Sequence, residues 1–190
     1  TPRLVALGLG HVPGVTKVAR TAKPAGAFGR CAERSPGKDT STGHWEMMGC
    51  VLAEQFPVYE RGFPPEIIDA FVKRAKLPGV LCNAAASGTE VLTRLGEEHV
   101  RTKKPIVYTS ADSVFQVAAH EEHFGLERLY ECCVIAREIL DPFGVGRVIA
   151  RPFVGAPGSY KRTYNRRDYS LKPFSETTLD RLTKAGVPVI

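Results

Sequence analysis

Apolar and polar positions in the middle of the chain follow a helical spacing that recurs four times. After Pro64-Pro65, apolar residues return every three or four positions as far as Lys76, which predicts an amphipathic helix with one buried stripe. Ser87-Gly88-Thr89-Glu90 has the pattern of a capping box and opens a second such segment. The spacing therefore predicts helices over 64–76, 87–101, 126–140 and 177–184.

Short apolar, β-branched runs separate these helices and predict strands over 80–82, 105–110 and 145–151. Helices that alternate with strands indicate an α/β fold. Ligands of such folds collect at the carboxyl ends of strands, so Ser110 and Asp112, which end the second strand, are candidate binding residues. Residues from about 175 onward are expected to enter a different sheet.

The run from Ser35 to Glu46 combines Lys38, Asp39 and Thr40 at an expected helix start. Asp, Ser and Thr are common helix caps, and capping is the slightly favoured interpretation of the run taken alone. A helix N-terminus also presents unpaired N–H groups and a positive dipole end, which stabilise phosphate. Both interpretations, a cap and a phosphate-binding or nucleophilic loop, stay open at this point.

Composition indicates an ordinary globular protein. The 190 residues are 43% hydrophobic and 24% charged, and no apolar stretch approaches the roughly 20 residues of a membrane span. The five cysteines are odd in number and form no CxxC pair, which favours reduced thiols in the cytoplasm. The chain starts without Met and ends on an apolar run, so we expect a piece of a longer protein.

The formal net charge of +6 fits either nucleic acid or small phosphorylated anions as partners. The densest basic stretch, residues 161–169, interleaves tyrosines with cations, a pattern that could stack on bases and hold a nucleic-acid backbone. The other cations are scattered among acids, as on solvated helix faces. Nucleic acid is therefore a rival hypothesis to a small anion.

Three further motifs have a functional and a structural interpretation. Arg147 and Arg151 lie on one face of a predicted strand, where they would form an anion subsite or, about equally, edge salt bridges. His120 and His123 lie three apart on an expected helix face, but without a third ligand a structural role is favoured over a metal site. The glycines of Gly8-Leu9-Gly10-His11-Val12-Pro13-Gly14 have the wrong spacing for a dinucleotide loop.

Taken together, several long motifs resemble the phosphopentomutase (phosphodeoxyribomutase) family of the alkaline-phosphatase superfamily. Members of this family interconvert ribose 1-phosphate and ribose 5-phosphate, and the corresponding 2-deoxyribose pair. The motifs are Gly37-Lys38-Asp39-Thr40, Thr42-Gly43-His44-Trp45-Glu46, Ala86-Ser87-Gly88-Thr89-Glu90, residues 106–116, Ala118-Ala119-His120-Glu121-Glu122, residues 145–155, and Asn165-Arg166 with Asp168-Tyr169.

The resemblance implies a role for each site residue. Thr40 would be the phosphorylated nucleophile and a metal ligand, with Lys38 and Asp39 positioning it, and the reaction would pass through a phosphothreonine and a bisphosphorylated sugar. Two Mn²⁺ ions would activate the threonine, and a sugar bisphosphate would act as activator. By the same resemblance, Asp112 would hold ribose hydroxyls, Ser110, Val114 and Ile149 would shape the pocket, and Arg147 and Arg162 would meet the distal phosphate.

For the fold, the resemblance implies a small α/β cap domain, a mixed sheet with helices packed on it, flanked by partial segments of an alkaline-phosphatase-like α/β core. The expected parts are a core segment at 1–55, the cap at 56–171 and a return into the core at 172–190. The other metal ligands would lie outside this chain, which alone is expected to be inactive.

This chain departs from the family pattern at Ala84-Ala85, where Lys-Pro is usual, and at Arg167, where His is common. The first departure weakens the expected ligand contacts of that loop. The expected partner is a pentose phosphate, with no nucleic acid, no membrane and a monomeric, cytoplasmic protein. A non-catalytic sugar-phosphate-binding module or a basic RNA-binding domain stays as the alternative.

Overall fold

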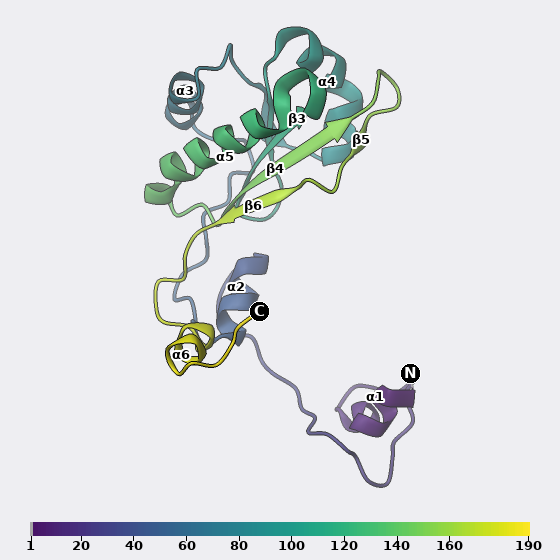
Figure 1. Ribbon diagram of the computed structural model, residues 1–190. Coiled ribbons are helices and arrows are strands. Elements are labelled where there is room, and N and C mark those ends of the chain that lie inside the picture. Colours follow the sequence, from purple (N-terminus) through teal and green to yellow (C-terminus); the bar gives the residue numbers. More distant parts are fainter. Residues whose placement is uncertain (1) are drawn as a thin grey trace. The chain divides into compact units, whose positions relative to one another are not determined.

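A computed structural model describes residues 2–190 and divides the chain into two compact units that meet between Arg34 and Ser35. The first unit, drawn in purple in Figure 1, contains helix α1 (Pro2–Leu7) and the short 3₁₀ helix η1 (Leu9–His11). The rings of His11 and Phe28 stack there at 5.1 Å between centroids. Gly8 precedes η1 and Gly10 lies within it.

The second unit contains a six-stranded mixed sheet. Strands β1 to β4 are neighbours in sequence order, and β5 and β6 both pair with β4 antiparallel. The β1–β2 and β3–β4 pairs are parallel, whereas β2 and β3 are antiparallel. The strands are β1 (Leu81–Ala85), β2 (Ile106–Thr109), β3 (Val114–His120), β4 (Arg147–Val154), β5 (Lys161–Arg162) and β6 (Arg167–Ser170).

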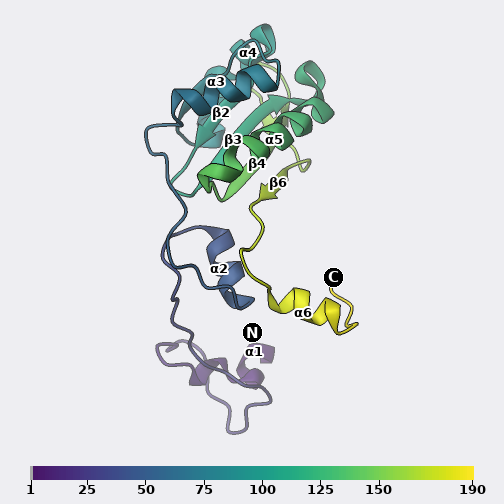
Figure 2. The ribbon, with the colours of Figure 1, turned by 90° about the vertical axis from the view of Figure 1, so that its left-hand side faces the viewer.

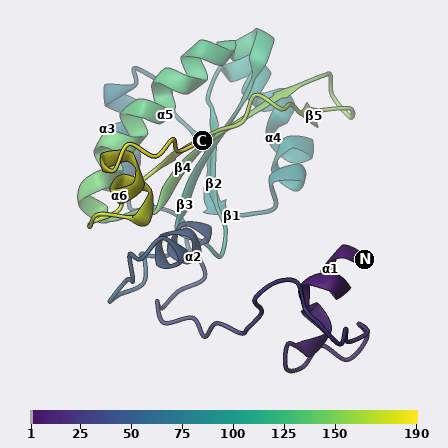
Figure 3. The same cartoon turned by 60° about the horizontal axis from the view of Figure 1, so that its bottom comes forward.

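Helices cover both faces of the sheet (Figure 3). On one face, α3 (Pro65–Arg74) and α5 (Leu126–Leu140) pack on alternate strand residues, among them Val107, Val117 and Val148. On the other face, α4 (Gly88–Thr102) packs over a smaller cluster, whose buried members are Leu81, Val91, Leu92, Ile106, Tyr108, Ala118 and Phe153. The period of two along each strand separates the residues of the two layers.

The remaining helices of the second unit flank the sheet. Helix α2 (Thr40–Met47) precedes it, and β6 leads through residues 171–177 to α6 (Thr178–Lys184), as Figure 2 shows. The start of α6 bonds to the end of α2, because the backbone N–H of Thr178 donates to the Met48 carbonyl. Two short helices, η2 (Glu121–Gly125) and η3 (Asp141–Phe143), bracket α5.

The predicted α/β class and mixed sheet are confirmed. The helix predicted over 126–140 has those bounds, and each of the other three begins and ends within two residues of its prediction. Strand β3 was not predicted, and the expected helix under His120 is wrong, since His120 ends β3 and only His123 lies in η2. Ser87 precedes α4 but makes no capping hydrogen bond.

No helix among residues 2–190 combines the length and apolarity needed to cross a membrane.

His99 and His120 form a buried pair between α4 and β3, which explains the His120 motif structurally. His99 accepts a hydrogen bond at Nε2 from the backbone N–H of His120 at 2.9 Å and donates from Nδ1 to the Lys104 carbonyl at 2.7 Å. His120 accepts at Nδ1 from the backbone N–H of Glu122 and donates from Nε2 to the Gly155 carbonyl. Each ring thus uses one nitrogen as donor and the other as acceptor, which is the pattern of neutral imidazoles.

Burial lowers the pKa of His99 to about 4, below its ordinary value of 6.5. In the unfolded chain this imidazole takes up a proton below about pH 6.5, while in the folded chain it stays neutral down to about pH 4. We expect the free energy of unfolding to be largest above pH 6.5 and to fall by about 2 kcal/mol between pH 7.5 and pH 5 through this group.

Urea unfolding at both pH values measures this loss. A His99→Gln variant should have a lower stability at pH 7.5 but a weaker pH dependence, whereas His44→Gln, which changes an exposed imidazole, should keep the wild-type dependence. An unchanged slope in His99→Gln would assign the acid sensitivity to another group.

Candidate functional site

The expected site residues come from four separate parts of the second unit. Lys38, Asp39 and Thr40 lie at the start of α2, and Ser110 and Asp112 lie in the loop between β2 and β3. The others are Val114 on β3, Arg147 and Ile149 on β4, and Arg162 on β5.

Asp39 is the N-cap of α2 and is buried, while Thr40, the first helical residue, is exposed. The Oδ1 of Asp39 accepts from the backbone N–H of Ser41 at 2.8 Å, which fixes the first turn of the helix. His44, one turn later, donates from Nδ1 to the Thr40 carbonyl at 2.7 Å. The capping interpretation of this run is therefore confirmed, and it leaves the Thr40 hydroxyl at an exposed helix N-terminus.

Arg147 is surrounded by carboxylates, and we call Asp39, Asp112, Arg147 and Asp168 the carboxylate–arginine cluster. Its Nη2 lies 3.3 Å from Asp39 Oδ2 and 3.4 Å from Asp112 Oδ2, and its Nη1 lies 3.6 Å from Asp168 Oδ2. The Arg147 side chain is only 9% exposed. Its Nε is buried and has no hydrogen-bond partner among residues 2–190.

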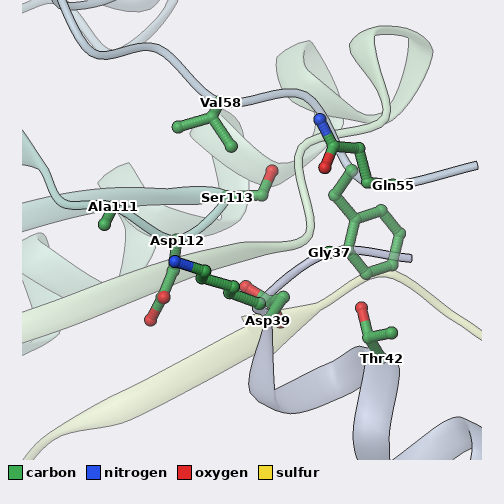
Figure 4. Close-up of a pocket in the computed structure, with 10 residues that line it drawn as sticks. Gly37, Asp39, Thr42, Gln55, Val58, Ala111, Asp112 and Ser113 are labelled. Carbon is green, nitrogen blue, oxygen red and sulfur yellow. The ribbon is translucent and has the colours of Figure 1, made fainter. Parts of the chain in front are cut away.

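Two pockets flank this cluster. A small one, with a volume of about 20 Å³, lies between the first turn of α2 and the loop before β3, where Asp39 and Thr42 face Asp112 and Ser113 (Figure 4). A larger and more open one, of about 260 Å³, is lined by Thr40, Ser41, His44, Trp45, Arg147, Asp168 and Ser170. The larger pocket joins the exposed threonine to the buried arginine.

Sheet register places Val114 and Ile149 on the same face as Arg147. Val114 pairs directly with Arg147, and Ile149 pairs with Gln116 on one side and Asp168 on the other. Both apolar side chains are 2% exposed and belong to neither of the two hydrophobic clusters. They form an apolar floor next to the charged groups.

Arg162 lies farther along the sheet. It pairs with Phe153, six positions from Arg147 on β4, which corresponds to about 20 Å along the strand. Its guanidinium lies at the N-terminus of α4, where a Cβ added to Gly88 would overlap Arg162 Nη2 and the Tyr108 hydroxyl. The register therefore places Arg162 in a different part of the site from Arg147.

Tyr108, Arg151, Arg162 and Arg166, which we call the arginine–tyrosine cluster, form this second part of the site. Burial raises the pKa of the Tyr108 phenol, and the charges of Arg162 and Arg151 act against that rise. Arg151 donates from Nε to Gln116 Oε1 at 3.1 Å, and burial lowers the pKa of its guanidinium. Arg166 bonds to both Asp168 oxygens, at 2.6 and 2.8 Å, and so connects the two clusters.

The edge salt bridges considered for Arg147 and Arg151 are present for Arg147 only. Within residues 2–190, Arg151 and Arg162 have no carboxylate in salt-bridge range. Two guanidiniums without a carboxylate partner, beside a helix N-terminus and a phenol, make a site suited to an anion.

Sequence reasoning missed Tyr108, and it did not assign roles to Asp168 or Arg166. Tyr108 lies two residues after Ile106 on β2 and therefore on the same face, which the strand period alone could have predicted. Arg166 and Asp168 both lie within the basic run of residues 161–169. Asp168 is an acid among these cations, and this could have indicated an ion pair with Arg166.

No cluster of three or more His, Cys, Asp or Glu side chains able to hold a metal ion occurs in the part of the chain from residue 2 to residue 190. The residues present therefore do not form a metal site by themselves, and we derive no step through a metal. The manganese expectation rests on the resemblance alone.

The chain is 60% identical, over its whole length, to a phosphopentomutase of Anaeromyxobacter dehalogenans strain 2CP-C and covers 48% of that protein. Over its whole length, the chain is similar to phosphopentomutases. Phosphopentomutases of Caldanaerobacter subterraneus subsp. tengcongensis and Desulfitobacterium hafniense strain Y51 are 57% and 53% identical to it. No protein-family model matches the chain.

The chain spans about half the length of the curated phosphopentomutases that it matches. The resemblance found from the motifs is thus confirmed at the level of the family name. The roles of individual residues stay predictions.

The contact at Gly88 leads to a test of the arginine–tyrosine cluster. In Gly88→Ala, the new methyl group would displace the flexible end of Arg162 and press on the buried Tyr108 hydroxyl, which lies 2.6 Å from the added Cβ, so both members of the cluster would shift. We expect inorganic phosphate to bind roughly tenfold more weakly, since a charge-assisted contact is lost. Phosphate titration followed by NMR measures this.

Gly29→Ala is the matched control, because a Cβ there meets no atom within 4 Å. Equal phosphate affinity in Gly88→Ala and Gly29→Ala would show that the cluster does not hold the anion.

Proposed function

We propose that this chain is the central, cap-bearing part of a phosphopentomutase that interconverts ribose 1-phosphate and ribose 5-phosphate, and the 2-deoxyribose pair. The observation that carries the proposal is the placement of an exposed Thr40 and a buried Arg147 on one pocket, in a chain similar throughout to phosphopentomutases. In this proposal the pocket binds the pentose phosphate between α2 and the part of the sheet face that α4 leaves uncovered.

The proposed chemistry uses Thr40 as a phosphoryl carrier. A phosphoryl group on Thr40 would be transferred to the free hydroxyl of the sugar phosphate, so that the bond from phosphorus to the Thr40 oxygen breaks and a bond to the sugar oxygen forms. The hydroxyl proton replaces the phosphoryl group on Thr40. The bisphosphorylated sugar then reorients in the pocket. Its other phosphoryl group is transferred back to the Thr40 oxygen, which regenerates the phosphothreonine.

The N-terminus of α2 supports this assignment. A phosphoryl group on Thr40 would lie beside N–H groups that have no partner within the helix, and the helix dipole favours its negative charge. Asp39 fixes the turn through Ser41, as the predicted positioning role requires.

The basic run is better explained by a small anion than by nucleic acid. Of its cations, Arg166 is paired with Asp168, and Arg167 stacks 3.9 Å from the Tyr130 ring centroid. Arg162 lies beside Gly88 and Tyr108. All three arginines are exposed to solvent, but Asp168 neutralises Arg166 and Arg167 lies against the Tyr130 ring, so fewer cations are available to a nucleic-acid backbone than the run of residues suggests.

We also propose that the protein is a monomer and that it is located in the cytoplasm, where thiols stay reduced. All five cysteines are free, and burial raises the pKa of the Cys133 thiol well above its ordinary value, which keeps it unreactive.

Arg162 provides the test that separates a sugar-phosphate site from an RNA surface. Ribose 5-phosphate should bind the 190-residue chain, and Arg162→Ala should weaken binding at least tenfold because a guanidinium contact to phosphate is lost. The measurement is a calorimetric titration, run beside a titration with a labelled single-stranded RNA.

Arg101→Ala, which removes an exposed arginine near the end of α4, is the charge-matched control and should bind ribose 5-phosphate as the wild type does. Tight RNA binding without sugar-phosphate binding would replace the proposal with the RNA-binding alternative.

Thr40 provides the test of mechanism in the longer protein that contains this chain. Thr40→Ala should abolish incorporation of labelled phosphate from a sugar bisphosphate, because the acceptor oxygen is gone, while Thr42→Ala should still become labelled. Acid-stable label on Thr40→Ala would place the nucleophile elsewhere.

A further inference from the structure

Asp39 uses its two carboxylate oxygens for two different elements. Its Oδ1 accepts from the Ser41 N–H within α2, and its Oδ2 lies 3.3 Å from Nη2 of Arg147 on β4. The two ionic side chains are 4% and 9% exposed, so water screens this contact poorly. The residue before Thr40 is thereby tied to a sheet residue 108 positions away.

The same guanidinium is the group expected to meet an anionic ligand. Its Nη2 is shared between Asp39 and Asp112, and its Nη1 faces Asp168. A phosphate that approached Arg147 would come close to these carboxylates, and like charges at such distances repel strongly in a partly buried site. Asp39 and an anion therefore compete for Arg147.

The pocket on the Asp112 side of the contact is too small for an anion. The pocket between Asp39 and Asp112 has a volume of about 20 Å³, which holds a water molecule but not a sugar phosphate. The larger pocket reaches Arg147 from the Thr40 side. An anion that entered from there would compete with Asp39 for the guanidinium, and an anion that displaced Asp39 would remove this tie between α2 and β4.

We propose that Asp39 is an electrostatic latch, a positioning residue that holds α2 and Thr40 against β4 until an anion binds Arg147. The identity of that anion as the phosphate of a pentose phosphate rests on the proposed function, whereas the latch contact does not. The competition is reciprocal. A bound anion weakens the Asp39–Arg147 ion pair, and the intact ion pair lowers the affinity of Arg147 for the anion by the same factor.

The test uses Asp39→Asn in the 190-residue chain. Asn keeps an oxygen for the Ser41 N–H but loses the charge that pairs with Arg147, so α2 stays capped and is released from β4. We expect backbone amides of residues 40–47 to exchange with deuterium about tenfold faster, while those of β3 and α5 exchange as in the wild type.

The same variant should bind inorganic phosphate about fivefold more tightly, because a competing carboxylate is gone. Faster amide exchange in α2 together with higher phosphate affinity distinguishes a latch from a merely structural residue. Loss of a structural residue would speed the exchange and lower the phosphate affinity. Asp39→Ser, which also caps a helix well and carries no charge, should reproduce both effects and serves if the Asn variant folds poorly.

Asp141→Asn is the matched control, since it also converts an ion-paired carboxylate, the partner of Arg137, into an amide. It should leave exchange of residues 40–47 and phosphate affinity unchanged. Unchanged exchange in Asp39→Asn and Asp39→Ser would refute the latch, and weaker phosphate binding would refute the competition. A wild-type chain that binds no phosphate would overturn the proposed anion site, with the exchange measurement still deciding the latch contact.

Discussion

A guanidinium withdrawn from water must be neutralised by charges fixed around it, and in this chain the requirement is met at Arg147. Its partners come from the N-cap of α2, from the loop before β3 and from β6. These segments are far apart in sequence, and each carries one of the carboxylates that Arg147 needs. Satisfying one buried charge thus places the helix that bears Thr40 at the edge of the sheet.

The sheet can accommodate such a charge because α4 covers only part of its second face. Where α4 packs, the strands present Ile106, Ala118 and Phe153. Beyond it, the same face carries Gln116, Arg147 and Arg151, while the opposite face stays apolar under α5. Because side chains alternate between the two faces, one strand contributes residues to both layers. The part of the second face that α4 does not cover is exposed to solvent and carries polar residues.

Local patterns predicted much of this fold, and long-range contacts account for what they missed. The apolar stripes of α3 and α4 are strongly periodic, and both helices were predicted with close bounds. Strand β3 is buried on both faces, so its residues show no alternation, and the charges after His120 suggested a helix. At the site, the resemblance supplied Asp39, Asp112 and Arg147, but no local pattern links residues 108 positions apart.

The two clusters differ in charge, and the difference bears on how a ligand would lie. Around Arg147 the carboxylates outnumber the guanidinium, whereas within residues 2–190 Arg151 and Arg162 have no carboxylate in salt-bridge range. While Asp39 holds Arg147, an anionic group is therefore favoured near Arg162, and hydroxyl groups, which can donate to carboxylates, are favoured near Asp112 and Asp168. A phosphate reaches Arg147 only by displacing Asp39. In the proposed reaction, a sugar phosphate bound this way would keep its phosphate away from α2 and turn a hydroxyl toward Thr40, as phosphoryl transfer from that residue requires.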